Sequence, residues 1–238
     1  MGRAKGFFIT GTDTGVGKTI AAAAIIRLLM GNGTKVFGMK PIETGCKASI
    51  YGDLLPEDGM ILKEVAGMKE DIREIVPYPF RTPVAPLVAS REEGKEINIE
   101  VIKERFDALS KKYDAGVVEG AGGLLVPVKK DFFMLDLAKE LNLPILIVSP
   151  NRLGTLNHTL LTVKYALDHG AEVAGIIMNT PNPGGAGVAE KTNAEVLKEL
   201  SPVPVIGELP YIEDISNASL AAIAQKGIDS GALAGHIC

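Results

Sequence analysis

The apolar positions of the chain follow two patterns that alternate from one end to the other. Short, almost continuous apolar runs, typical of strands that are buried on both faces, lie at 6–10, 35–39, 115–118, 144–149, 173–178 and 204–207. Helical spacing of the apolar positions predicts helices at 19–30, 57–66, 97–112, 156–169 and 188–200, and residues 136–141 are predicted to end a further short helix. Strands that alternate with helices predict an α/β fold, a mostly parallel central sheet of about seven strands with helices on both faces.

The length of the chain and the absence of breaks in this pattern set the domain organisation. The 238 residues are enough for one large α/β domain or two small ones. No linker or internal repeat divides them, so we expect a single domain over 1–238. The longest irregular segment, 78–96, contains several prolines. It is either a functional loop or a proline-stiffened surface crossover, and the pattern leaves both open.

The net charge, the apolar runs and the cysteines indicate which partners and which cellular compartment to expect. The net charge of −4 gives no basic surface for nucleic acid or an anionic membrane, and we expect neither partner. No apolar run approaches the roughly 18 residues of a membrane span, and the first apolar stretch is too short for an export signal.

Cys46 and Cys238 are expected to be free thiols in a reducing cytoplasm, with a nucleophilic Cys46 as the alternative. The histidines lie scattered, without the spacing of metal ligands.

The residues between the first predicted strand and the first predicted helix read GTDTGVGKT at 11–19. Glycines let the backbone wrap closely around an anion, and the amides of such a turn bind phosphate together with a helix N-terminus. Lys18 would reach the outer phosphates of a nucleotide, and the Thr19 hydroxyl would ligate Mg²⁺. Thr12 stands where the usual pattern has its first glycine, one place after Gly11. We predict a nucleoside triphosphate site, the alternative being a glycine-rich turn without a ligand.

Two further charged residues follow predicted strands, at the edge where open α/β sheets bind their ligands. Lys40 follows the second strand and could stabilise negative charge on a transferred phosphoryl group, or could be a solvated lysine beside a proline turn. Glu119 ends a hydrophobic strand, where phosphate-loop enzymes bind Mg²⁺, usually through Asp. The alternative for Glu119 is a carboxylate that caps a turn. The glycine-rich residues 120–123 would allow a ligand to approach the backbone closely.

Two polar residues carry less information by themselves. Asp58 lies at the start of a predicted helix, where acidic residues are common because they complement the helix dipole. Asn179 follows a late strand, and its amide could bind the edge of a base. Asparagine is also common in loops after strands, so spacing alone assigns neither residue to the site.

Taken together, these motifs resemble those of the dethiobiotin synthetases, ATP-dependent enzymes of the P-loop NTPase superfamily that act in biotin synthesis. The resemblance extends from Phe8 to about Ile212. Its motifs, in chain order, are GTDTGVGKT (11–19), KPIETG (40–45), PYPFRTPVAP (77–86), VVEGAGG (117–123), LGTLNH (153–158) and GELPYI (207–212). This ordered set is much more specific than a phosphate loop alone.

The resemblance implies a role for each matching position. Lys18 and Lys40 would flank the phosphates and the reacting carbamate as catalytic residues, and Thr19, Asp58 and Glu119 would ligate Mg²⁺. Residues of the phosphate loop, the metal site and the base-binding turns would hold ATP: Gly15, Val16, Gly17, Lys18, Thr19, Ile20, Asp58, Glu119, Gly120, Ala121, Gly122, Asn179, Thr180, Pro210, Tyr211 and Ile212. The diamino acid substrate would contact Thr44, Gly122 and Asn157.

The reaction implied by the resemblance joins 7,8-diaminononanoate and CO₂ with consumption of MgATP. One amine takes up CO₂ as a carbamate, whose oxygen attacks the γ-phosphate to give a carbamic–phosphoric anhydride. The second amine then closes the ring and expels phosphate, which yields dethiobiotin. No protein nucleophile is required, in agreement with the absence of a Ser–His or Cys–His pattern. The resemblance also implies a homodimer that holds the distant carboxylate of the substrate at its interface.

The chain departs from the family pattern at two positions. The family often has Glu where this chain has Gly15, and some members have Tyr at the place of Lys191. Beyond Ala222 no motif is found, and the nucleotide preference is left open.

Three other functions compete with this interpretation. A partner-regulated ATPase of the partition or division-site class would carry a lysine early in the loop. This chain has Asp13, Thr14 and Gly15 there, and none of these is a lysine. A glutamine-dependent amidase would need a further domain, for which there is no room. A non-catalytic nucleotide-binding module would not need two lysines and three candidate metal ligands at strand ends.

Overall fold

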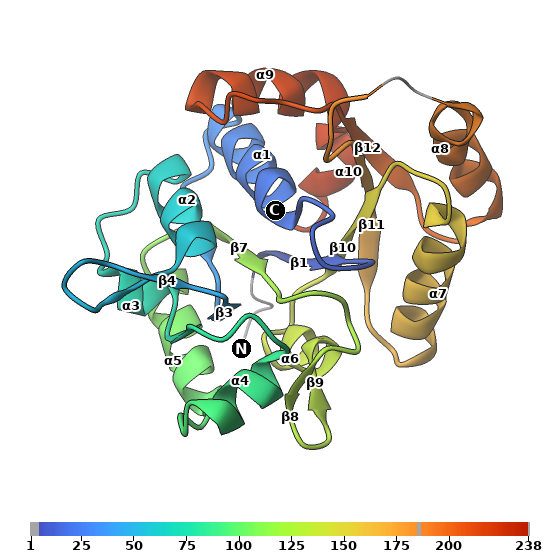
Figure 1. Ribbon diagram of the computed structural model, residues 1–238. Helices are drawn as coiled ribbons and strands as arrows, with labels where there is room; N and C mark the ends of the chain where they lie inside the picture. Colours follow the sequence, from blue (N-terminus) through green and yellow to red (C-terminus); the bar gives the residue numbers. More distant parts are fainter. Residues whose placement is uncertain (1–4, 185–186, 238) are drawn as a thin grey trace.

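A six-stranded sheet forms the centre of the computed structural model, which describes residues 5–184 and 187–237 (Figure 1). Its order is β12–β11–β10–β1–β7–β2, and every neighbouring pair is parallel. The strands are β1 (Gly6–Gly11), β2 (Val36–Met39), β7 (Ala115–Glu119), β10 (Ile145–Pro150), β11 (Val173–Asn179) and β12 (Val205–Leu209). The predicted parallel sheet is confirmed, with six strands in place of about seven.

The remaining strands of the described residues form three short pairs outside this sheet. They are β3 (Ile42–Thr44) with β6 (Tyr78–Phe80), β4 (Lys47–Ala48) with β5 (Leu54–Leu55), and β8 (Pro127–Lys129) with β9 (Phe132–Phe133). Pro41 separates β2 from β3 and has no amide hydrogen to donate to a continuing ladder. The chain therefore leaves the central sheet there.

Helices cover both faces of the central sheet, as predicted. They are α1 (Lys18–Gly31), α2 (Glu57–Val65), α3 (Ile72–Ile75), α4 (Pro86–Glu92), α5 (Ile99–Ser110), α6 (Met134–Glu140), α7 (Thr155–Asp168), α8 (Val188–Leu200), α9 (Asn217–Gly227) and α10 (Ser230–Ala234). In Figure 1, α1, α2 and α9 lie above the sheet, and α5 and α6 lie below it.

The core lies where these two layers meet the central strands. All residues of β1 and β10 are buried, which explains why their sequences are almost continuously apolar. Helix α1 presents four fully buried alanines, residues 21–24, and packs against β1, β2 and β7. Small side chains allow the helix that carries the glycine-rich loop to lie close to the sheet, so the position of the loop is fixed by a tightly packed layer.

Two regions without a clear sequence pattern prove to be structured. The proline-rich segment 78–96 contains β6 and α4, and α4 begins at Pro86, a position where proline's missing amide hydrogen costs nothing. The end of the chain forms α9 and α10, whose Leu220, Ala224 and Leu233 are fully buried. Among the described residues, no helix has the length and apolar character needed to cross a membrane.

The parallel topology brings several chain segments to one edge of the sheet. The glycine-rich loop follows β1, Lys40 follows β2, Glu119 ends β7 and Asn179 ends β11. Carboxyl ends of parallel strands point the same way, so these residues meet although they are far apart in the sequence.

Candidate active site

The loop between β1 and α1 is held in its curved shape by two left-handed glycines. Gly15 has a φ of 73° and Gly17 a φ of 90°, a region that other residues rarely adopt. A Cβ atom at Gly17 would overlap the Asn179 side chain, whose Nδ2 donates to the Val16 carbonyl at 2.9 Å. Asn179, predicted to contact the base, therefore also fixes the loop. A side chain at Gly15 would meet open space, although its backbone would be strained.

Lys18 lies against the inside of this loop. Its side chain is almost fully buried, and its Nζ donates to the Asp13 carbonyl at 3.4 Å. Burial lowers the pKa of Lys18, and the nearby Lys40 ammonium lowers it further, against the pull of Glu119, Asp58 and Asp13. Two cations therefore lie close together, an arrangement suited to polyanionic ligands such as phosphates.

Lys40 forms the centre of a buried charge cluster. Its Nζ lies 2.8 Å from Asp58 Oδ2 and 2.5 Å from Glu119 Oε1, and it also reaches the Gly120 carbonyl. Burial by itself would lower the pKa of Lys40, but the two carboxylates outweigh burial and raise it. Lys40 is thus buried and paired with two carboxylates, which excludes the solvated lysine that the sequence left open.

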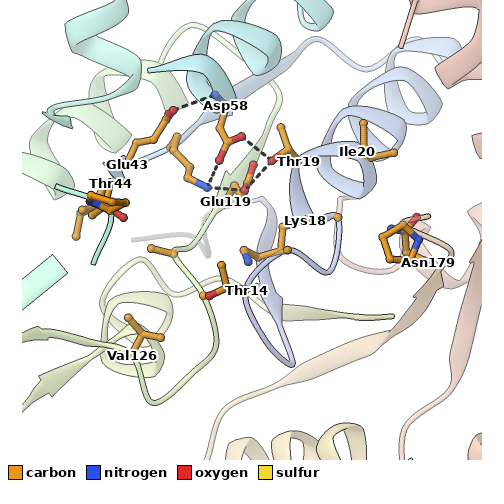
Figure 2. A pocket seen from close by; sticks show the side chains of 18 of the residues that line it. Thr14, Lys18, Thr19, Ile20, Glu43, Thr44, Asp58, Glu119, Val126 and Asn179 are labelled. Atoms are coloured by element: carbon orange, nitrogen blue, oxygen red, sulfur yellow. Dashed lines mark hydrogen bonds and ion pairs between the residues drawn. The ribbon is translucent and has the colours of Figure 1, made fainter. Parts of the chain in front are cut away.

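The carboxylates of the cluster lie around the Thr19 hydroxyl. Thr19 Oγ1 is 3.0 Å from Asp58 Oδ1 and 3.1 Å from Glu119 Oε1 (Figure 2). Burial raises the pKa of Glu119, although Lys40 opposes this shift. For Asp58 burial also acts to raise the pKa, but the charge and hydrogen bond of Lys40 overcome it, and the pKa is lowered.

The residues predicted to ligate Mg²⁺ form a donor set that fits this ion. Asp58, Glu119 and Thr19 offer only oxygen atoms, and Glu119 Oε2 is buried without a hydrogen-bond partner. Within the described residues, no three His, Cys, Asp or Glu side chains form a metal cage. Mg²⁺ is usually bound by one or two carboxylates together with phosphates and waters, so two carboxylates and a hydroxyl beside a phosphate loop suffice.

Glu43 belongs to the same cluster and was not predicted as a site residue. Its carboxylate accepts hydrogen bonds from the backbone amides of Asp58 and Gly59, each at 3.0 Å. Burial raises the pKa of Glu43 to about 7, in spite of these amides and Lys40. The motif at 40–45 contains the residue, but only the tertiary contact between β3 and α2 reveals its position.

A cavity of about 650 Å³ opens over this cluster. Most of the predicted ATP-binding residues line it, together with Lys40 and Thr44: Gly15, Gly17, Lys18, Thr19, Ile20, Asp58, Glu119, Ala121, Gly122, Asn179, Thr180, Pro210, Tyr211 and Ile212. Val16 and Gly120 are buried and do not line this cavity, and Asn157 is exposed on α7 and does not line it either. The segment 83–86 forms one wall, which supports the functional-loop interpretation of the proline-rich region.

A second cavity of about 380 Å³ adjoins the first. It lies between the outer side of the loop, residues 11–14, the turn 123–126, and three residues of α7: Leu161, Thr162 and Tyr165. Thr14 and Val126 line both cavities. A ligand of the phosphate site could therefore extend toward α7.

Two other residues singled out in the sequence, Cys46 and Lys191, do not line the larger cavity. Cys46 is a free, buried thiol, and burial together with the Glu43 charge raises its pKa to about 11, which disfavours a nucleophilic thiolate. Cys238 lies outside the described residues. Lys191 is exposed on α8.

Comparison with known proteins gives close relatives over nearly the whole chain. Residues 5–219 match the family described as AAA domain. The chain is 46% identical over 235 residues to the ATP-dependent dethiobiotin synthetase BioD of Thermodesulfovibrio yellowstonii, covering 96% of this chain and 98% of that protein. It is 42% identical over 207 residues to the protein of the same name from Aquifex aeolicus, covering 87% and 89%.

Solved structures of similar fold include a putative plasmid partition protein from Borrelia burgdorferi bound to AMPPNP. Its TM-score is 0.55, with 91% of this chain and 90% of that chain covered. At 17% identity this likeness concerns the fold alone, and it agrees with the P-loop NTPase fold predicted from the sequence.

Proposed function

The chain belongs to the AAA-domain family and to the ATP-dependent dethiobiotin synthetases, which are ligases of biotin biosynthesis, and we propose the reaction that it catalyses in detail. It converts 7,8-diaminononanoate, CO₂ and ATP to dethiobiotin, ADP and phosphate. The observation that carries this proposal is the buried Lys40 ammonium, held between Asp58 and Glu119 beside Thr19. A simple nucleotide-binding module has no need of this costly buried cluster.

ATP lies in the larger cavity, with its phosphates against the loop amides and the N-terminus of α1. Lys18 turns from the Asp13 carbonyl to the outer phosphates. The base lies between the Asn179 end of β11 and the turn with Tyr211, both of which line the same cavity. The adenine edge is bound by the Asn179 amide, whose nitrogen donates one of its two hydrogens to the Val16 carbonyl of the loop.

Thr19, Asp58 and Glu119 would hold Mg²⁺, which would neutralise charge on the outer phosphates when bound. The oxygen atoms of these residues are arranged so that they can bind a cation. Glu119 binds Lys40 through Oε1 and leaves Oε2 without a hydrogen-bond partner, so the carboxylate can serve a second cation without losing its first.

The chemistry starts on the substrate. One amine attacks CO₂ and loses a proton, which forms a carbamate. The carbamate oxygen attacks the γ-phosphorus of ATP, the bond to the β-phosphate oxygen breaks, and ADP leaves. The second amine attacks the carbonyl carbon of the resulting anhydride, loses its proton, and expels phosphate as the ureido ring closes.

Lys40 and Lys18 stabilise the negative charge that spreads over the carbamate and the transferred phosphoryl group. Charge stabilisation by fixed donors in a dry site is the largest contribution that such a protein can make, because no covalent enzyme intermediate is needed. Thr44 lines the cavity near Lys40 and contacts the substrate from the opposite side.

The reacting amines of the diamino acid lie in the larger cavity beside Thr44, its tail extends into the adjoining cavity between the loop and α7, and a second copy of the chain covers that tail. Leu161 on α7 and Leu125 in the facing turn are 60% and 55% exposed, although both line this cavity. Leu153, just before α7, is 86% exposed. Apolar side chains around an open cavity favour a partner surface, and a homodimer closes the substrate site.

The experiment that tests this function is ADP release with each substrate omitted in turn. We expect ADP only when diaminononanoate and bicarbonate are both present, because the phosphoryl acceptor is formed from the two. ADP release that does not depend on the diamine would reject the proposal and favour an ATPase of the partition class.

A further inference from the structure

Helix α2, which carries Asp58, has no capping side chain of its own. Its N-cap residue is Pro56, which accepts no hydrogen bond through its side chain. By contrast, α5 begins with Asn98, whose side chain accepts from the Glu100 amide at 2.9 Å. The free amides at the start of α2 must therefore find an acceptor elsewhere in the chain.

That acceptor is Glu43, which comes from β3. Glu43 is only 6% exposed, and its two oxygens each accept one amide hydrogen, from Asp58 and from Gly59. Figure 2 shows the bond to Asp58. A Cβ at Gly59 would overlap the Val76 side chain, so the glycine allows the start of α2 to pack closely against Val76 beside Glu43. A carboxylate at a helix N-terminus is also favoured by the helix dipole.

The hydrogen bond to Glu43 fixes the backbone of Asp58, whereas the Asp58 side chain is partly exposed. The Asp58 side chain is 37% exposed, so packing alone does not hold it in place. Its oxygens reach Thr19 at 3.0 Å and Lys40 at 2.8 Å, while its amide is bound to Glu43. Glu43 lies three residues after Lys40, so the same short segment supplies the cation of the cluster and anchors its carboxylate.

We propose that Glu43 is a positioning residue, which holds the start of α2 so that Asp58 faces the magnesium site at the correct distance from Thr19 and Lys40. The inference rests on the role of Asp58 in the proposed function. Residues that orient a metal ligand typically change metal affinity by about 10-fold to 100-fold when they are removed. Loss of Glu43 should therefore weaken metal binding without removing any ligand.

The test compares Glu43→Ala, Glu43→Gln, Asp58→Asn and Asn98→Ala at pH 8. Mn²⁺ binding to each protein, saturated with a non-hydrolysable ATP analogue, is measured by calorimetry, and turnover is titrated with Mg²⁺. Asn98→Ala is the matched control, because it removes a helix cap that lies outside the cavity.

We expect Glu43→Ala to weaken Mn²⁺ binding about 10-fold and to raise the Mg²⁺ concentration needed for half-maximal turnover, while high Mg²⁺ restores much of kcat. Glu43→Gln keeps one acceptor and should lie between this variant and the unmodified protein. Asn98→Ala should bind Mn²⁺ normally, even if it melts earlier.

Two results would overturn the inference in different ways. Normal Mn²⁺ affinity in both Glu43 variants, with weak binding by Asp58→Asn, would reject the role of Glu43 and leave the proposed function standing. Normal affinity in Asp58→Asn as well would reject the magnesium role of Asp58, and with it this part of the proposed function.

Discussion

At the scale of single residues, the site depends on an ammonium group that is buried together with its carboxylate partner. Lys40 is 4% exposed and Glu119 1%, while the exposed Lys47–Glu57 pair, at a similar 2.8 Å, lies in solvent. Ion pairs on the surface contribute little to the stability of a fold, whereas a buried charge that loses its partner destabilises the fold strongly. The two lysines therefore serve as a natural comparison.

Replacing Lys40 by Ala should lower kcat about 100-fold to 1000-fold, because a charge-stabilising donor is lost from a dry site. Steady-state turnover checks this, with circular dichroism as the measure of fold. Lys47→Ala is the control and should keep normal turnover. Lys40→Gln, which retains donors without charge, replaces the alanine variant if that variant unfolds. Near-normal turnover in a folded Lys40 variant would contradict the assigned role.

Cys46 should be inert toward Ellman's reagent in the folded protein at pH 8. Burial raises its pKa to about 11 from an ordinary 9.0, so the reactive thiolate is scarce. The raised pKa also means that the contribution of this thiol to stability is present below pH 9 and is lost as the pH rises through 11. A Cys238→Ser background isolates the signal, which should appear only in denaturant. Rapid labelling of the folded variant would refute the prediction.

At the scale of elements, the helices that border the site are tied to the sheet by buried polar contacts. Ser149 at the end of β10 forms hydrogen bonds of 2.5 and 2.6 Å to Thr155 and Thr159 of α7. All three side chains are buried. The contacts hold α7, which forms a wall of the smaller cavity, at a fixed distance from the phosphate loop.

Ser149→Ala should lower the free energy of unfolding by about 1–3 kcal/mol, because two buried hydroxyls lose their common partner. Urea denaturation of both proteins measures the difference. Thr192→Ala on α8 is the control, since its hydroxyl is exposed and bonds only to the preceding turn. Equal stability of the two variants would show that the hydroxyl cluster does not secure α7.

Sequence patterns predicted the central elements because each buried strand and amphipathic helix obeys a local period. Helix α8 was predicted with the bounds that the structure gives it, and β1, β7 and β11 differ by a residue. The short pairs such as β3 with β6 were not predicted, since pairing over a long sequence separation leaves no local period. The same limit applies to α4 within the proline-rich segment.

The residues of the candidate site also divide into those that the sequence could place and those that it could not. Lys18, Lys40 and Glu119 could be placed from the sequence because they follow strands whose ends must converge. Asp58 could be placed only through a family resemblance, since acidic residues at helix starts are common. Glu43 could not be placed, because its partners are backbone amides of a helix formed later in the chain.

At the scale of the whole molecule, the proposed function requires a second copy of the chain to complete the substrate site. Leu161→Glu should dissociate the dimer, because a charge would be buried in an apolar interface. Analytical ultracentrifugation gives the mass, and turnover should fall together with it. Ile50→Glu is the control: Ile50 is 91% exposed in the β4–β5 turn, on the side of the molecule away from α7 in Figure 1. A monomeric unmodified protein with full turnover would contradict the predicted dimer.

The central claim is that phosphoryl transfer from ATP activates a carbamate made from the diamine. Turnover with ¹³C-bicarbonate, followed by mass spectrometry of the product and assay of ADP, tests it most directly. We expect one labelled carbon in each dethiobiotin and one ADP released for each dethiobiotin formed. ADP release without labelled product, or a labelled product formed without ATP, would contradict it.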